Sequence, residues 1–563
     1  MIEFVSANIA PIMFGVIILF LLSGFPVAFS LSACGLFFGF VGLELGLIPA
    51  TLFQALPLRV FGIMQNDTLL AIPFFTLMGL IPDRSGMAED LLETVGQVFG
   101  PLRGGLALAV IFVGALLAAT TGVVAASVIS MGLISLPIMM RYGYSRPIAA
   151  GVITASGTLA QAIPPSLVLI VMADQLGRSV GDMYKGAMIP ALALVGLYAL
   201  FIIGLAIFKP KMVPALPPEA LAYREPDGSS GLRSLGILAI VVTAVSIALG
   251  KNYETVLTWL EGQEVLAPAL DETIVVALTF GTIFALVLAV INRVLKLGLL
   301  SRIAERVTFV LIPPLILIFL VLGTIFLGVA TPTEGGAMGA VGALVMAISR
   351  GRLDLKTLIQ ALESTSRLSI FVLFILVGST IFSFVFTAVD GQIWVEHLFD
   401  RLPGGQLGFL IFVNTVIFFL GCFIDFFEIA FILLPLLGPV ADKMGIDLIW
   451  FGVIIALNLQ TSFLTPPFGF ALFYLRSVAP GSAYLDRITN KRIEGFKTGD
   501  IYRGSIAFVI IQIFMVGLVI AFPQLVTGGL DEKTKVDLDT IQIQQPAGGA
   551  GGWGESGGGD AWK

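Results

Sequence analysis

"SGTLAQAIPPSLVL" (residues 156–169) interrupts an apolar stretch with two adjacent prolines. Proline lacks the backbone N–H and its ring clashes with the preceding turn, so a regular helix cannot run through the pair. Inside a membrane, every carbonyl freed by such a break needs a partner within the protein or in a polar cavity. The stretch therefore predicts a broken helix whose backbone has a function in addition to crossing the membrane.

The composition around this stretch is that of a membrane protein. The chain has 563 residues, of which 57% are hydrophobic and 12% charged, and its mean hydropathy is +1.01. These values exclude a soluble globular domain. Apolar runs of roughly 15–20 residues recur, as expected for transmembrane helices. We predict an all-α polytopic protein in a lipid bilayer, with its clearest spans at 12–29, 190–208, 235–249, 273–291, 309–327, 368–385 and 506–522.

Charge and residue counts exclude several function classes. The net charge of −6 is spread over loops and tail without a basic patch, so we expect no nucleic-acid partner. Cys34 and Cys422 both lie in apolar segments and imply no disulfide framework. The single histidine, His397, is predicted to lie in an interfacial loop, "VEHLFDRLPGG". A zinc protease site or a haem held between helices needs two histidines.

The interruption occurs twice. Both copies have the spacing P-x5-G-x20-P-P, which is a poor fit to two unrelated proline kinks in a chain with 29 prolines. We therefore interpret the two segments as an internal repeat. Its residues are Pro137, Gly143, Pro164 and Pro165 in the first copy and Pro439, Gly445, Pro466 and Pro467 in the second.

A long apolar segment with a small polar centre precedes each broken helix. Residues 104–137 have Thr120, Thr121 and Gly122 at the centre, and residues 407–439 have Gly421 and Asp425. A single helix of about 34 residues would measure about 50 Å, against a hydrocarbon core of about 30 Å. Two short arms meeting at a polar tip fit better than one long span. A re-entrant hairpin followed by a broken helix, present twice, is typical of inverted-repeat transporters that bind their cargo near the bilayer midplane.

Oxygen-bearing side chains gather at both breaks. Broken helices expose carbonyls and helix ends that coordinate a cation or face a carboxylate. Hydroxyl, amide and carbonyl oxygens suit Na+. Asp425 is the acid closest to the centre of the second hairpin, and an intramembrane acid is a functional candidate. Glu428 either shares that role or faces a neighbouring subunit. The other candidates are Ser156, Gly157 and Thr158 at the first break and Asn458, Gln460, Thr461 and Thr465 at the second.

Basic residues predict the orientation. Arg103, Arg141 and Arg146 flank the first hairpin, and the loop at 485–504 carries five further basic residues, so both are predicted to be cytoplasmic. The second hairpin is flanked by Arg401 and Lys443, each beside an aspartate, so we expect it to open on the opposite side.

Five ordered motifs resemble the large permease subunit of tripartite ATP-independent periplasmic (TRAP) transporters, the DctM-like family. The resemblance covers nearly the whole chain apart from an insertion and the tail. The motifs are "NDTLLAIPFFTLMGLIPDRSGMAEDLL" (66–92), "ATTGVVAASVISMGLISLPIMMRYGYSRPIAAGV" (119–152), "GTLAQAIPPS" (157–166), "GVATPTEGGAMGAV" (328–341) and "GIDLIWFGVIIALNLQTSFLTPPFGFALF" (445–473).

The resemblance implies a secondary transporter rather than an enzyme, placed in the bacterial inner (cytoplasmic) membrane. It implies an elevator mechanism with Na+ as the coupling ion and import of an organic anion, such as a dicarboxylate, a sugar acid or a sulfonate. The implied partners are a small four-helix membrane subunit and a periplasmic substrate-binding protein. A stand-alone Na+/carboxylate symporter, which needs no binding protein, is the alternative. A channel and an intramembrane aspartyl protease are further rivals.

The resemblance also implies two sodium sites. The first tip reads Thr-Thr-Gly where the family more often has Ser-Gly. Thr121, Thr158, Asn458 and the two proline pairs complete the expected binding set. The implied sodium ligands are Thr120, Gly122, Ser156 and Gly157 in the first site and Gly421, Asp425, Gln460, Thr461 and Thr465 in the second.

The expected organisation alternates scaffold and transport segments. The insertion at about 210–302 is either a tolerated connector or a docking surface, with one extra helix and an extended loop. Because the chain starts directly in the large-subunit pattern, we expect no small subunit fused before it. The predicted segments are scaffold helices (1–100), first hairpin and broken helix (101–177), scaffold helices with the insertion (178–400), second hairpin and broken helix (401–480), cytoplasmic loop and last helix (481–525), and a disordered Gly-rich tail (526–563).

Overall fold

The computed structural model describes residues 2–530 except 222, 224, 226–229, 262–269, 401, 487 and 488. Nearly all elements in this part are helices, which confirms the predicted all-α class. Residues 531–563 of the predicted disordered tail lie outside the described residues.

The N-terminal segment contains a turn that hydropathy did not reveal. The predicted single span at 12–29 is wrong, because one helix ends at Leu22 and the next begins at Val27. Gly24 has φ +80° and Pro26 lacks an N–H, so one continuous helix cannot run through residues 24–26. The helices of this segment are α1 (Ile2–Ala7), α2 (Ile9–Leu22), α3 (Val27–Glu44), η1 (Ala50–Ala55), α4 (Leu56–Met64), α5 (Asp67–Arg84) and α6 (Met87–Phe99).

The first interrupted unit has the predicted form. Its two hairpin arms pack against each other, and Gly122 adopts φ +59° at the tip, a left-handed conformation that favours glycine. The Pro164–Pro165 bond is cis. The helices are α7 (Gly105–Thr121), α8 (Val124–Arg141), α9 (Arg146–Thr158), η2 (Leu159–Gln161) and α10 (Leu167–Gln175).

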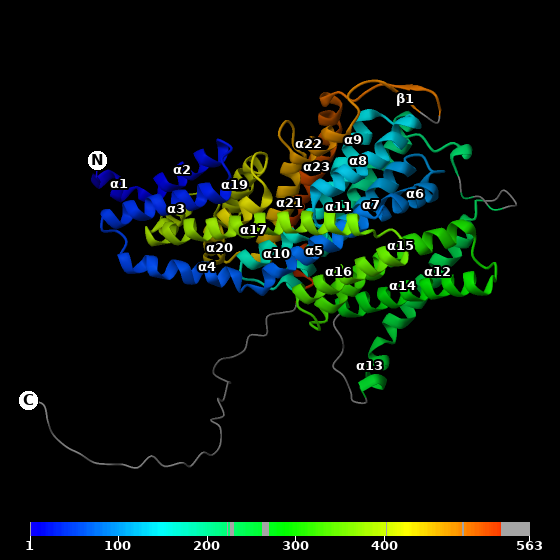
Figure 1. Ribbon diagram of the computed structural model, residues 1–563, viewed down its shortest axis with the longest axis horizontal. Coiled ribbons are helices and arrows are strands. Elements are labelled where there is room, and N and C mark those ends of the chain that lie inside the picture. Colours follow the sequence, from blue (N-terminus) through cyan, green and yellow to red (C-terminus); the bar gives the residue numbers. More distant parts are fainter. Residues whose placement is uncertain are drawn as a thin grey trace, which may run out of the picture. The chain divides into compact units, whose positions relative to one another are not determined.

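The middle of the chain includes the insertion. Its acidic part is partly helical, in contrast to the extended loop that we expected, and its two long helices lie beside each other (Figure 1). His397 is exposed within a helix, so its predicted loop position is wrong. The elements are α11 (Val180–Phe208), η3 (Pro210–Met212), η4 (Pro218–Ala220), α12 (Leu232–Lys251), α13 (Tyr253–Glu261), α14 (Leu270–Leu295), α15 (Arg302–Phe326), α16 (Pro332–Ser349), α17 (Leu355–Ala388) and α18 (Gly391–Asp400).

The second interrupted unit repeats the order of the first. A tip at 421–425 separates two helices, and a break with a cis Pro466–Pro467 bond separates the next two. The elements from here to the end of the described chain are α19 (Gly405–Leu420), α20 (Phe426–Lys443), α21 (Leu448–Leu464), α22 (Phe470–Val478), β1 (Tyr484–Leu485), β2 (Arg492–Ile493), α23 (Thr498–Ala521) and α24 (Gln524–Thr527).

Short polar residues start several of these helices. The side chain of Asn66 accepts from Thr68 N at the start of α5, and Asp447 does the same for Ile449 N and Trp450 N at the start of α21. Thr331 and Glu334 form a capping box at the start of α16. Each cap satisfies N–H groups that the first turn leaves without a partner.

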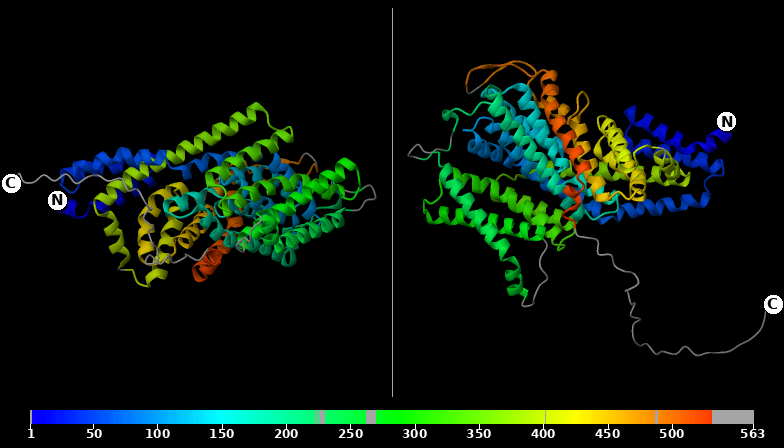
Figure 2. Two further views of the ribbon diagram at one scale, coloured as in Figure 1. Left: turned by 90° about the horizontal axis from the view of Figure 1, so that it is seen from below. Right: turned by 180° about the vertical axis from the view of Figure 1, so that it is seen from behind.

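The helices pack in two groups of contacts that matter for the site. α5 lies against α16 and α17, and α17 lies against α3. The broken helix α9 packs on α23, and α21 also contacts α23. The right view of Figure 2 shows α23, in orange to red, beside the cyan first unit.

The strands β1 and β2 pair antiparallel within a loop that forms ion pairs with the end of α8 and the start of α9. Arg141 at the end of α8 forms an ion pair of 3.1 Å with Asp486, and Arg146 forms one of 3.0 Å with Glu494. The Thr489 hydroxyl, which donates to Asp486, is the main reason that the pKa of this carboxyl falls to about 2. The two segments predicted to be cytoplasmic therefore lie at the same end of the helices.

The lengths and hydropathy of the helices fit a multi-pass membrane protein. Within the described residues, eight helices are long and apolar enough to cross a membrane, or nine if the segment from Ala50 to Arg84, bent by 41°, counts as one. The arms α7 and α19 and the broken helix α21 are shorter apolar helices. Short arms are what a hairpin that turns within the bilayer requires.

Candidate ion and substrate site

The two interrupted units meet at their breaks. The side-chain amide of Gln460, in α21, donates to the Thr158 hydroxyl at the end of α9, with 3.5 Å between the heavy atoms. α21 also contacts η2, which leads into the first proline pair. One predicted residue from each copy of the repeat therefore contributes to a shared buried centre.

The first hairpin is held tightly against α9. A methyl group added to Gly157 would lie 2.3 Å from Val128 Cγ2 in α8, and one added to Gly114 would lie 2.5 Å from Ser156 Cβ. At the tip, a methyl group on Gly122 would lie 3.2 Å from Leu167 Cγ, where the chain resumes as α10. The tip of the hairpin thus reaches the break. The Thr120 hydroxyl instead donates to Leu117 O within its own helix.

The second hairpin touches the second broken helix in the same manner. A methyl group on Gly421 would lie 2.8 Å from Ser462 Oγ in α21. The hydroxyls of Thr461 and Thr465 donate to carbonyls one turn earlier, those of Leu457 and Thr461. The Asn458 amide donates to Asn414 O, which joins α21 to α19. Pro466 is half-buried and Pro467 exposed, so the second break lies nearer the surface than the buried first break.

Asp425 has a structural task that the sequence did not reveal. Its carboxylate accepts from Phe426 N at 2.7 Å, and Glu428 accepts from Asp425 N, so the two acids form the capping box of α20. No hydrogen bond among the described residues joins Asp425 to Gln460, Thr461 or Thr465. The predicted second sodium set is therefore only partly brought together, through Gly421 and α21.

Several polar atoms at the meeting point of the units have no partner. The hydroxyl of Ser156, both amide atoms of Gln161 and the amide oxygen of Gln460 are buried without a hydrogen bond in the described part of the chain. All three side chains are fully buried. Unpaired buried polar atoms destabilise the fold by about 1–3 kcal/mol each, so their retention indicates a ligand or a functional role. Oxygen atoms of this kind are the ligands that Na+ prefers.

Tyr198 extends this buried centre. The Gln512 amide, from α23, donates to the Tyr198 hydroxyl at 2.7 Å, and Gln460 also contacts that hydroxyl. The side chains of Tyr198 and Gln512 are buried, and the Gln512 amide oxygen has no partner in the described structure. α11 and α23 thus supply polar groups to a centre that the sequence assigned to the hairpins and broken helices alone.

A cavity of about 550 Å³ lies where α4, α5 and α17 approach α10 and α20. Arg59 projects from α4 with its guanidinium carbon 5.5 Å from the ring centre of Phe384. The Ser383 hydroxyl is buried in the described structure without a partner. At the same cavity, the Asn66 amide donates to Asp174 at 2.8 Å, which joins α5 to the continuation of the first broken helix.

Most of the chain matches one known protein family. Residues 14–525 match the family model described as "Tripartite ATP-independent periplasmic transporter, DctM component". The chain belongs to this TRAP transporter family. The match confirms the resemblance read from the five motifs, and it places the protein among membrane permeases rather than enzymes.

Relatives within the TRAP family differ in their named substrates. The chain is 28% identical over 426 residues to the C4-dicarboxylate TRAP transporter large permease protein DctM of Pseudomonas aeruginosa, covering 76% of this chain and 81% of that protein. It is 24% identical to the sialic acid TRAP transporter large permease protein SiaM of Vibrio cholerae, with coverage of 90% and 94%. It is also 24% identical to the isethionate TRAP transporter permease protein DctMQ of Oleidesulfovibrio alaskensis, with coverage of 83% and 60%. Among solved structures, the YdaH transporter of Alcanivorax borkumensis is similar over 85% of this chain and 91% of its own, at 14% identity and a TM-score of 0.49.

Sequence reasoning did not single out several residues of this candidate site in the TRAP permease, although some of them carry a signal. Gln161 lies inside the stretch quoted first, three residues before Pro164, and a polar amide in an apolar run is a signal for function within a membrane. Arg59 is a lone cation in an apolar run, which is a signal for function within a membrane. Tyr198 and Gln512 lie in long apolar helices remote from any motif, and only packing brings them to the centre.

Proposed function

We propose that the chain is the large permease subunit of a sodium-coupled TRAP transporter that imports an organic anion across the bacterial inner membrane. The observation that carries the proposal is the buried meeting of two broken helices, with oxygen atoms of Ser156, Gln161 and Gln460 left unpaired. A small membrane subunit and a substrate-binding protein complete the proposed transporter. The tripartite family and the relatives named above support this assembly.

The residues at the breaks fit sodium as a co-transported cation. Ser156 Oγ, Gln161 Oε1 and Gln460 Oε1 supply neutral oxygen ligands, and the interrupted backbone near the prolines adds carbonyls. Sodium there would favour the closed arrangement of hairpin tips against broken helices. Each charge moved inward across 100 mV contributes about 2.3 kcal/mol to uptake.

The cavity beside Arg59 fits the anionic substrate. A guanidinium presents paired N–H donors that match a carboxylate or sulfonate, and Ser383 adds a hydroxyl without a partner among the described residues. The cavity lies between α4, α5 and α17, which we assign to the scaffold, and α10 and α20, which we assign to the moving unit. Sliding of the moving unit against the scaffold would carry the substrate across, as an elevator mechanism requires.

The test is uptake by the transporter purified through a tag on this chain, with the subunits that accompany it, and reconstituted in liposomes. Labelled succinate, sialic acid and isethionate are offered with the cognate binding protein present. We expect at least one to accumulate under an inward Na+ gradient and not under an equal K+ gradient. Equal uptake in both gradients contradicts sodium coupling, and full uptake by the chain alone contradicts the tripartite assembly.

Replacing Arg59 with Gln tests the substrate cavity. We expect the KM for the transported anion to rise about tenfold or more, because a charge-assisted contact contributes roughly 1.5–3 kcal/mol. The Na+ concentration for half-maximal uptake at saturating substrate should stay within about twofold. Arg367→Gln, which removes an exposed ion pair on α17, is the matched control. An unchanged KM in Arg59→Gln would show that the substrate binds elsewhere.

A further inference from the structure

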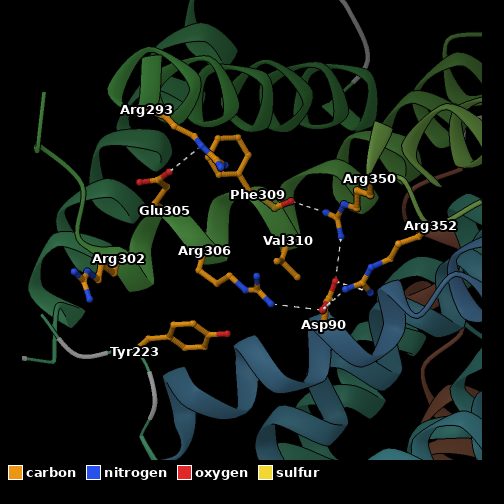
Figure 3. A pocket seen from close by; sticks show the side chains of 10 residues that line it. All are labelled: Asp90, Tyr223, Arg293, Arg302, Glu305, Arg306, Phe309, Val310, Arg350 and Arg352. Carbon is orange, nitrogen blue, oxygen red and sulfur yellow. Dashed lines mark hydrogen bonds and ion pairs between the residues drawn. The ribbon is translucent and has the colours of Figure 1, made fainter. Parts of the chain in front are cut away.

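A second cavity, which shares no lining residue with the cavity beside Arg59, lies between the insertion and the scaffold (Figure 3). Its volume is about 520 Å³. The elements around it are α6, the end of α14, the start of α15 and the end of α16. Five arginines line it, namely Arg293, Arg302, Arg306, Arg350 and Arg352.

Three of these arginines form ion pairs with the same carboxylate, that of Asp90. Asp90 lies 3.5 Å from Arg306, 3.9 Å from Arg350 and 3.0 Å from Arg352. Figure 3 shows these guanidinium groups converging on it. The three cations around one anion repel one another. A second anion would offset this repulsion and stabilise the cluster.

The remaining carboxylates near the cavity leave it with surplus positive charge. Glu305 pairs with Arg293 at 3.7 Å, Glu93 contacts the Tyr223 hydroxyl, and Glu225 accepts from the backbone N of Arg302. Among the described residues, five arginines therefore face four carboxylates. The surplus of one positive charge in this described part of the chain matches the single negative charge of a phosphodiester.

Two of the arginines keep unused donors. Arg306 Nε is buried and has no hydrogen-bond partner in the described structure, although its guanidinium lies 5.6 Å from the ring centre of Tyr223. The Arg302 side chain makes no ion pair among the described residues, and it is exposed. An anion in the cavity would accept from both.

The orientation predicted from basic residues places the cavity on the cytoplasmic side of the membrane, where anionic lipid headgroups attract basic residues. Leu216 N donates to Gly100 O and Gln97 donates to Ala220 O, so the segment leading to Tyr223 runs beside the loop that carries Arg103. That loop is on the side predicted to be cytoplasmic by its arginines. Basic pockets between transmembrane helices at this level bind phosphate-bearing headgroups.

The neighbouring helix offers a surface for acyl chains. Directly after Arg293, Val294 and Leu295 are 71% and 63% exposed. Along the same helix, Phe280, Val287 and Ile291 are also exposed. An acyl chain along α14 would place its headgroup at the arginines.

We propose that the five-arginine cavity binds a phosphoryl anion and thereby ties the insertion to the scaffold. The ligand contacts Arg293 and Arg302 from the insertion side and Arg306, Arg350 and Arg352 from the scaffold side. The two possible sources of this group are an anionic phospholipid headgroup and free phosphate.

Titration of the delipidated full chain in mild detergent, followed by native mass spectrometry, tests the proposal. The probes are dioleoylphosphatidylglycerol, dioleoylphosphatidylcholine and inorganic phosphate. We expect the phosphatidylglycerol to bind at least about tenfold more tightly than the phosphatidylcholine, and Arg306→Gln to remove most of that preference, since a charge-assisted contact contributes roughly 1.5–3 kcal/mol. Arg302→Gln should weaken binding in the same direction, and it remains informative if Arg306→Gln does not fold. Arg367→Gln, with the same charge change on α17, should bind as the natural chain does.

The outcomes separate the two sources. Selective binding of phosphatidylglycerol that is lost in the cavity variants identifies a lipid headgroup. Saturable binding of inorganic phosphate that is lost in the same variants, with equal binding of both lipids, identifies a soluble source and also supports the site. If none of the three probes distinguishes the cavity variants from Arg367→Gln, the proposal is overturned.

Discussion

Replacing Gln460 with Met is expected to raise the Na+ concentration for half-maximal uptake by about 10- to 100-fold. The substitution keeps the volume of the side chain but removes the amide oxygen that is buried without a partner in the described structure. It also removes the hydrogen bond to Thr158, which joins the two broken helices. A contact to a charged group contributes roughly 1.5–3 kcal/mol, which sets the size of the effect. Uptake at different Na+ concentrations, at saturating substrate, measures it.

The matched control for this prediction is Gln97→Met. Gln97 makes the same type of amide contact, to Ala220 O, but lies on α6, remote from the breaks. We expect its Na+ dependence to remain within about twofold of the natural chain. The thermal unfolding of both variants shows whether they fold. A folded Gln460→Met variant with unchanged Na+ dependence would place the coupling ion elsewhere.

Replacing Gly504 with Ala is expected to lower the stability of the chain by about 1–3 kcal/mol or more. α9 and α23 cross so closely that a methyl group on Gly504 would lie 2.0 Å from Pro147 O, and one on Gly151 would lie 2.2 Å from Gly504 O. Because both neighbours are backbone carbonyls, neither relaxes by a change of rotamer, and the helices must separate. A lower unfolding temperature in detergent is the measurement, and reduced yield should accompany it.

Gly517→Ala, in the same helix, is the control for this crossing. Apart from its chain neighbours and the nearby backbone of its own helix, no atom in the described structure lies within 4 Å of a methyl group placed on Gly517. Alanine has the higher helix propensity, by about 1 kcal/mol, so Gly517→Ala should be neutral or slightly stabilising. Equal unfolding temperatures for Gly504→Ala and Gly517→Ala would contradict the close crossing of α9 and α23.

The domain boundaries and the sodium ligands read from the sequence stay predictions, whereas the repeat itself is visible in the structure. Periodicity and proline spacing located both hairpins and both broken helices, because these depend on local rules of chain geometry. The same local reading failed at 12–29, where a turn lies inside an apolar run, and at His397, where a polar run is helical.

The sequence by itself determined the class of the protein, its repeated interrupted helices, its family and the motifs that flank the breaks. Only the tertiary structure decided that Gln460 reaches Thr158 and that Asp425 caps α20. It also decided that Tyr198 and Gln512 join the buried centre, and that five arginines from distant segments share one cavity. Hydropathy patterns and helix breaks depend on residues that lie only a few positions apart in the chain. Contacts between residues about 300 positions apart depend on how whole helices pack. One amino-acid sequence does not show that packing directly.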